Sequence, residues 1–295
     1  MGSQYRRIGL GAGIAALAVM TVAGCSGSGG GSKTGSLPGT VTGGSGQGSA
    51  ISLVADAISQ ADKAGTVKMT GTMETTGTNA TSGTLTAQEE YSPKLAMSMS
   101  MDMGGQTISE VLIGTTVYMQ YSGLTSMTGG KPWASIDLSK AGGATGSLSS
   151  MLDSAKSYNP TTQLSALLAS GTVTQVGTAT VDGQQTTHYH GTLSAAQVLA
   201  LGSSQGHLTA DQISTLQSEF KTAGLKGETV DLWTASDNLP VEIKVTEQMD
   251  AAGVTGMTMD MHMSDWGAPV NIGAPPANEV YDMTSQLDTA LGSEN

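Results

Sequence analysis

Methionine recurs at every second residue in two short stretches, and no other pattern in the chain gathers so many chemically distinctive side chains. The eight residues are Met97, Met99, Met101, Met103, Met257, Met259, Met261 and Met263. A period of two places each set of four on one face of a β-strand. Thioether sulfur can bind Cu(I), and the flexible, polarizable side chain also suits a surface that receives irregular apolar groups. The two stretches therefore predict either a soft-metal site or an adaptable apolar face.

The residues between the methionines help to choose between these readings. Ser98, Ser100 and Asp102 separate the first set, and Asp260 and His262 lie within the second. Such alternation puts the methionines on the buried face of a sheet and the polar residues in solvent. Because a buried face is poorly accessible to an incoming ion, we favour binding of acyl chains over copper. An ordinary core with methionine as filler is the remaining alternative.

His188 and His190 lie two residues apart and share one strand face, a spacing that could hold a metal ion. No third ligand stands close to them in the sequence, so we expect an exposed polar face and no metal site. The chain also shows no Ser-His-Asp order and no glycine-rich phosphate loop after a strand. We therefore expect a protein that is not an enzyme and has no cofactor. Trp233 and Trp266 are expected to be structural.

The composition limits the partners of the chain. Its 295 residues carry a formal net charge of −12, which disfavours nucleic acid as a partner. The single cysteine, Cys25, excludes an internal disulfide. Residues 25–49 are mainly Gly, Ser and Thr and predict a flexible tether.

Cys25 follows a pattern typical of an exported, lipid-modified protein. Arg6 and Arg7 precede the apolar stretch Ile8–Ala23, which is short for a membrane-spanning helix but suits a secretory signal. The stretch ends in Val22-Ala23-Gly24-Cys25, which resembles the bacterial lipobox. We expect residues 1–24 to be a signal peptide and Cys25 to carry lipid, with acyl chains such as palmitate. The protein would then be anchored on the extracytoplasmic face of the cell membrane.

The rest of the chain predicts an α+β fold with one large antiparallel sheet of about ten strands. A helix is expected from Ile51 to Ala61, with Ser49 as its cap and Gly65 at its end. Asp182-Gly183 predicts a tight hairpin. Strand patterns occupy residues 67–74, 84–91, 95–103, 108–113, 116–121, 133–138, 172–181, 185–192, 228–234, 241–246 and 257–263. Helical patterns occupy residues 147–157, 160–169, 194–201 and 210–223.

The last part of the chain is expected to be irregular. Regular structure should end at Ala274-Pro275-Pro276, because proline removes a backbone donor. Residues 284–295 predict an acidic flexible tail. The helices are few and could cover a curved sheet only in part, so a cavity between helices and sheet is expected.

Short motifs in the C-terminal strands resemble a known family. They are Asp231-Leu232-Trp233, Leu239-Pro240-Val241, Ser264-Asp265-Trp266-Gly267 and Ala274-Pro275-Pro276. Together they are similar to the closing strands of actinobacterial LppX/LprG-type lipoproteins. The resemblance implies a fold like that of LolA and LolB, in which a strongly bent antiparallel sheet, or half-barrel, is closed by a few helices around an apolar cavity.

The resemblance also implies a function for residues 50–283, which would form one LolA-like lipid-binding domain. Its ligand would be an acyl lipid or lipoglycan of the cell envelope, and an export system is a possible partner. From the methionine pattern itself, we expect the eight methionines to line the cavity for the acyl chains. Two other functions remain open. One is a methionine-rich copper-binding envelope protein, and the other is a structural or sensory surface lipoprotein without a small ligand.

Overall fold

The computed structural model describes residues 45–286 except 93, 141–163, 166, 169, 199–216, 219, 223 and 252. Cys25 and the predicted signal peptide lie outside the described residues. So do most of the tether, most of the helices expected over 147–169 and 210–223, and the tail beyond residue 286.

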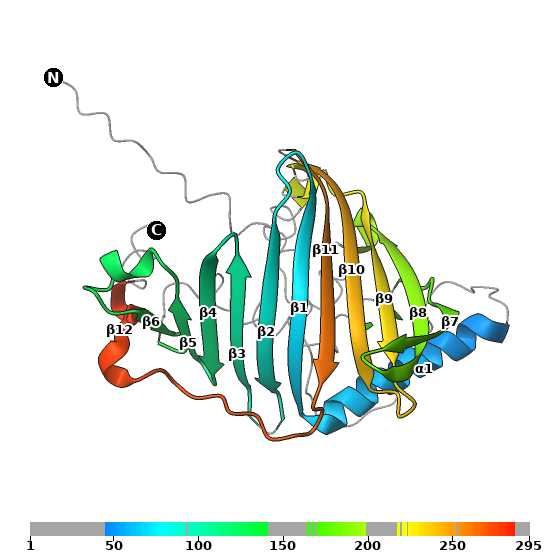
Figure 1. The fold of residues 1–295 in the computed structure, drawn as a ribbon, viewed down its shortest axis with the longest axis horizontal. Coiled ribbons are helices and arrows are strands. Elements are labelled where there is room, and N and C mark those ends of the chain that lie inside the picture. The colour runs from blue at the N-terminus through cyan, green and yellow to red at the C-terminus, as the bar shows by residue number, and fades with distance from the viewer. Residues whose placement is uncertain are drawn as a thin grey trace.

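One sheet of twelve strands dominates the described structure (Figure 1). Its strands follow the order β12-β6-β5-β4-β3-β2-β1-β11-β10-β9-β8-β7. They are β1 (Thr66–Gly77), β2 (Ser82–Glu90), β3 (Ala96–Met103), β4 (Gln106–Ile113), β5 (Thr116–Gln120), β6 (Trp133–Asp137), β7 (Thr174–Val181), β8 (Gln184–Ser194), β9 (Gly227–Thr234), β10 (Pro240–Ala251), β11 (Val254–Ser264) and β12 (Val280–Asp282). The protein is therefore mostly β, and the expected large sheet is confirmed.

The sheet differs from the prediction at its C-terminal edge. It is mixed, because β12 pairs with β6 in parallel while every other strand pair is antiparallel. The expectation that regular structure ends at Ala274-Pro275-Pro276 was wrong. After Pro276, the short 3-10 helix η2 (Ala277–Glu279) leads into β12, and Lys131 Nζ donates to the Val280 carbonyl at 2.7 Å. Proline interrupts pairing locally, but a later segment still reaches the unpaired edge of β6.

The tight hairpins follow the sequence signals. Asp182 and Gly183 join β7 to β8 with φ values of 49° and 77°, which matches the left-handed conformation that this dipeptide favours. Gly114, with φ of 61°, lies in the turn that joins β4 to β5. A second 3-10 helix, η1 (Leu124–Ser126), lies between β5 and β6.

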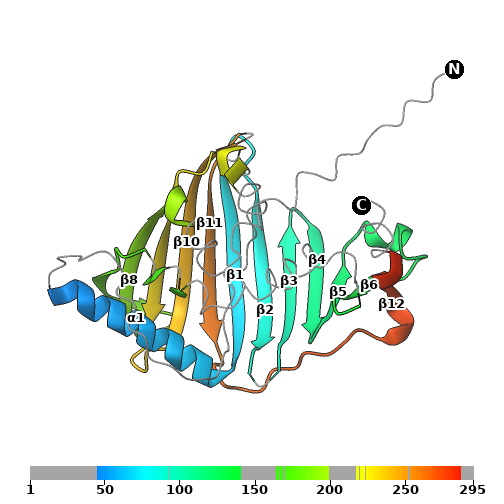
Figure 2. The ribbon, with the colours of Figure 1, turned by 180° about the vertical axis from the view of Figure 1, so that it is seen from behind.

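Helix α1 (Ser45–Ala64) covers part of one face of the sheet, obliquely across the strands near β8 and β10 (Figure 2). Ala50, Val54 and Ala57 are buried there in one core cluster with Tyr189 and Leu232. Ser49 was predicted as the helix cap, and this was wrong, because the helix begins earlier, at Ser45. Ala50, five residues after the start of the helix, is buried in the core. The expected stop is confirmed at Gly65, whose φ is 74°.

Strand register brings the two methionine sets to the same face. Met99 on β3 lies opposite Ala87 on β2, Ala87 lies opposite Met69 on β1, and Met69 lies opposite Met263 on β11. Side chains directly opposite one another in a ladder point to the same face. The methionines of β3 and β11 therefore share the face that α1 partly covers, although about 160 residues separate them in the chain.

Candidate functional site

The methionine face is the candidate site. We define it as the eight methionines of β3 and β11 together with Met69 and Met73 of β1, which lies between them. Six of the eight are buried, and Met103 and Met259 are partly buried against the same core. Met97 packs in a separate small cluster with Leu112 and Val117. The predicted burial is confirmed, while ligand binding by these residues remains a prediction.

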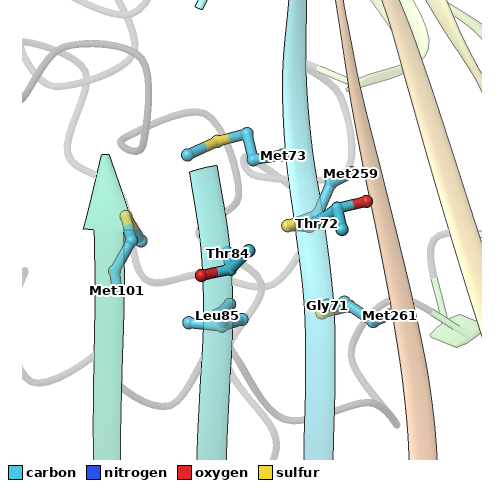
Figure 3. A pocket seen from close by; sticks show the side chains of 8 residues that line it. All are labelled: Gly71, Thr72, Met73, Thr84, Leu85, Met101, Met259 and Met261. Atoms are coloured by element: carbon cyan, nitrogen blue, oxygen red, sulfur yellow. The ribbon is translucent and has the colours of Figure 1, made fainter. Parts of the chain in front are cut away.

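A depression lies at the centre of this face (Figure 3). It is lined by Gly71, Thr72, Met73, Thr84, Leu85, Met101, Met259 and Met261. None of these residues is charged. The cavity volume is about 10 Å³, which is close to the minimum that one water molecule needs. An acyl chain would therefore need the methionine side chains to move apart, and their unbranched shape makes such repacking inexpensive.

Gly71 makes the depression possible. It lies opposite Leu85 on β2 and opposite Met261 on β11, but carries no side chain toward either. A Cβ atom at this position would lie 2.7 Å from the Asp260 carbonyl oxygen and 3.3 Å from Met261 Cγ. The close approach of β11 thus requires glycine here, and the missing side chain leaves room above β1.

Two glutamates that sequence reasoning missed lie at one end of the same face. Glu228 on β9 is directly opposite Glu247 on β10, and Glu247 is opposite Met257. Glu247 is 2% exposed, and its Oε1 has no hydrogen-bond partner within the described part of the chain. Burial, and next the charge of Glu228, raise the pKa of Glu247 to about 7. Burial also raises the pKa of Glu228 to about 7.

A third buried carboxyl, Glu89, lies on β2 between Val67 and Met97. It is 5% exposed, and burial raises its pKa to about 8. Glu110 on β4 lies opposite Met99 on β3, and burial also raises the pKa of Glu110. The apolar face is therefore bordered by carboxyl groups that bind protons more readily than exposed acids.

Strand alternation could have revealed these acids. Leu85, Ala87 and Glu89 follow a period of two, and Glu247 follows Val245 in the same way. The predicted strands were too short or too irregular for the pattern to be extended to them.

The opposite face of the sheet carries His188 and His190. They share a face as predicted. One ring nitrogen of each histidine contacts Oδ1 of Asp231: His188 Nε2 lies at 2.7 Å and His190 Nδ1 at 2.9 Å. The neighbour that was missing in the local sequence is thus Asp231 on β9, which lies 43 residues after His188 and 41 residues after His190. Trp233 stacks on His188, with ring centroids 4.3 Å apart.

Trp266 has the expected structural role. Its Nε1 donates a hydrogen bond to the Pro240 carbonyl oxygen at 2.8 Å, and its ring packs against the main core. This contact ties the loop after β11 to the start of β10. Within the described ranges, no helix has the length and apolar character needed to cross a membrane.

Comparison with known sequences identifies similar proteins. A family model described as LppX_LprAFG lipoprotein matches residues 129–272. A 31.2 kDa Streptomyces griseus protein, encoded between rplA and rplJ and described as uncharacterized, is 32% identical over 167 residues. The aligned part covers 56% of this chain and 52% of that relative, so the match spans about half of the relative's length.

Two solved structures are similar in overall arrangement. The lipoprotein LppX of Mycobacterium tuberculosis is 15% identical, with a TM-score of 0.45 over 77% of this chain and 99% of LppX. LprF of Mycobacterium bovis is 16% identical, with a TM-score of 0.43 over 78% of this chain and 98% of LprF.

Proposed function

We propose that this chain, of which the LppX_LprAFG lipoprotein model matches residues 129–272, binds and carries acyl lipids or lipoglycans in the cell envelope. The observation that supports this most is the joining of two distant methionine sets into one uncharged apolar face. The eight methionines would contact the acyl chains. The protein would act as a carrier and not as an enzyme.

Removal of apolar surface from water would drive binding, at roughly 25 cal/mol per Å². Such binding needs little directional polar recognition, which agrees with the uncharged lining of the depression. Because methionine adapts its shape, the site should accept several chain lengths. We propose that the sheet bends around the ligand as a half-barrel and that helices close the cavity over it.

The membrane anchor would be Cys25. Residues 1–24 would be removed as a signal peptide, and the tether 25–49 would connect the lipidated cysteine to the lipid-binding domain, residues 50–283, followed by an acidic tail. Two or more acyl chains would give stable anchoring, since one chain alone gives marginal binding. An export system in the same membrane is the proposed partner.

The carrier function is tested by enlarging two side chains of the methionine face, Met99 on β3 and Met259 on β11, of which Met259 lines the depression. In the double variant Met99→Trp and Met259→Trp, the larger rings should occupy the space between β3 and β11. We expect binding of a fluorescent acyl probe to fall at least about tenfold, or by about 1.4 kcal/mol, while the melting temperature changes little. The matched control is Ser100→Trp with Thr258→Trp, which adds the same rings to the opposite face of the same strands.

The carrier proposal fails if the wild type binds no acyl probe and yields no extractable lipid after expression in its own host. Native mass spectrometry of the same sample separates the alternatives. Bound copper would favour the metal-binding alternative, and neither lipid nor copper would favour a structural or sensory lipoprotein.

A further inference from the structure

A cluster of side chains with metal-ligating groups lies on the face opposite the methionines. Glu242 on β10 is directly opposite His262 on β11, and Asp260 precedes His262 by two residues on the same strand face. One ligand atom from each residue can be chosen so that all three lie within 4.8 Å of one another. All three side chains are partly buried. This set provides one nitrogen and two carboxylate oxygens at one place.

The ring of His262 is already oriented by another carboxylate. Its Nδ1 lies 2.8 Å from Oδ2 of Asp182, which the tight β7–β8 hairpin presents. The other ring nitrogen, Nε2, lies 3.7 Å from Asp260 Oδ1, beyond hydrogen-bond range. In metal sites, a ligating histidine usually gives its second nitrogen to such an outer carboxylate, which fixes the ring and its tautomer.

The oxygen that faces His262 Nε2 is not hydrogen-bonded. Asp260 Oδ1 is buried and has no hydrogen bond in the described structure. A buried acceptor without a donor loses its solvation energy, and a bound cation would restore it. The other oxygen, Oδ2, has a cationic neighbour, Lys244 Nζ at 3.4 Å.

Excess negative charge surrounds this place. Burial, followed by the charge of Asp260, raises the pKa of Glu242. Burial lowers the pKa of His262, but the hydrogen bond and charge of Asp182 and the charges of Glu242 and Asp260 outweigh it, so the pKa is raised.

We propose that Glu242, Asp260 and His262 form a binding site for one divalent transition-metal ion of the zinc class, with Asp182 as its outer carboxylate. The imidazole favours zinc over calcium, which takes oxygen ligands. Ligand atoms in a tetrahedral zinc site lie about 3.4 Å apart, so no pair of ligand atoms needs to approach by more than roughly 1.4 Å on binding. A water molecule would complete the coordination.

Lys244 provides a discriminating prediction. Its ammonium competes with the metal for Asp260, and its other cross-strand neighbour is Asp231. Lys244→Gln should therefore strengthen zinc binding, an effect that a purely structural cluster would not produce.

The experiment is a zinc titration of the full-length protein in detergent, after chelator treatment, against a competing chromophoric chelator. We expect one zinc ion per chain. His262→Gln and Glu242→Gln should each weaken binding by at least about tenfold, and Asp182→Asn by about tenfold. The matched control is His190→Gln, which alters the neighbouring His188–His190–Asp231 group and should leave zinc affinity unchanged.

Three outcomes would overturn the site: no zinc bound at roughly 100 µM free metal, unchanged affinity in both His262→Gln and Glu242→Gln, or loss of binding in His190→Gln. Melting curves without metal identify any variant that fails to fold, and Glu242→Gln is the milder change of the two. The site lies on the face opposite the methionines, so this test is independent of the lipid-carrier proposal.

Discussion

At the scale of single residues, the buried carboxyl groups distinguish this protein from an ordinary methionine-packed core. Glu228 and Glu247 lie directly opposite each other at the border of the apolar face, and both have a pKa raised to about 7. An acid with a raised pKa binds more protons in the folded state than in the unfolded state. Its contribution to stability is therefore complete below pH 4.5 and is lost as pH rises through about 7.

Replacing Glu247 with Gln tests whether ionisation of this carboxyl lowers the stability of the fold as pH rises. The variant cannot ionise, so it should be more stable than the wild type by roughly 1–2 kcal/mol at pH 8 and similar to it at pH 5. Urea unfolding at the two pH values measures the difference. The matched control is Glu74→Gln, at an exposed position of β1. A wild type that is more stable at pH 8 than Glu247→Gln would contradict the argument.

At the scale of elements, helix α1 is held to the sheet by a narrow apolar stripe. Val54 is fully buried, whereas Ile51, three residues earlier, is 37% exposed. Tyr91, the residue after β2, donates its hydroxyl hydrogen to the Ala61 carbonyl oxygen and so links the end of β2 to the last turn of the helix. Contact with the core, more than helix propensity, therefore stabilises this helix.

Shortening a buried side chain of this apolar stripe should lower the stability of the whole domain. Val54→Ala removes two buried methyl groups and should lower the free energy of unfolding by roughly 1–3 kcal/mol. Ile51→Ala removes more atoms, yet from a more exposed position, and should change stability by less than about 0.5 kcal/mol. Chemical denaturation of both variants checks the order, and equal losses would show that α1 does not pack in this way.

At the scale of the whole molecule, the family match and the lipobox pattern both bear on where the protein is located in the cell. The family match over residues 129–272 confirms the predicted resemblance, since it includes the motifs from Asp231 to Trp266. Cys25→Ser should release the protein from the membrane fraction or leave its signal uncut. Membrane fractionation and the mass of the mature N-terminus measure this result. Unchanged anchoring with normal cleavage would refute lipidation at Cys25.

The sequence alone determined the features that depend on local geometry. The period of two in the methionine sets predicted their burial on one face of each strand, because neighbouring side chains in a strand alternate between faces. Asp182-Gly183 predicted a hairpin for a similarly local reason, since both residues tolerate positive φ. The positions of most described strands followed from the same patterns.

Only the tertiary structure decided which strands lie side by side. Pairing of β1 with β11 joins the two methionine sets, pairing of β6 with β12 extends the sheet beyond the prolines, and pairing of β9 with β10 brings Glu228 to Glu247. The candidate zinc ligands likewise depend on Asp182 reaching His262, 80 residues away. A strand period is set by neighbouring residues, whereas register and partner are set by burial of a shared apolar face across the whole chain.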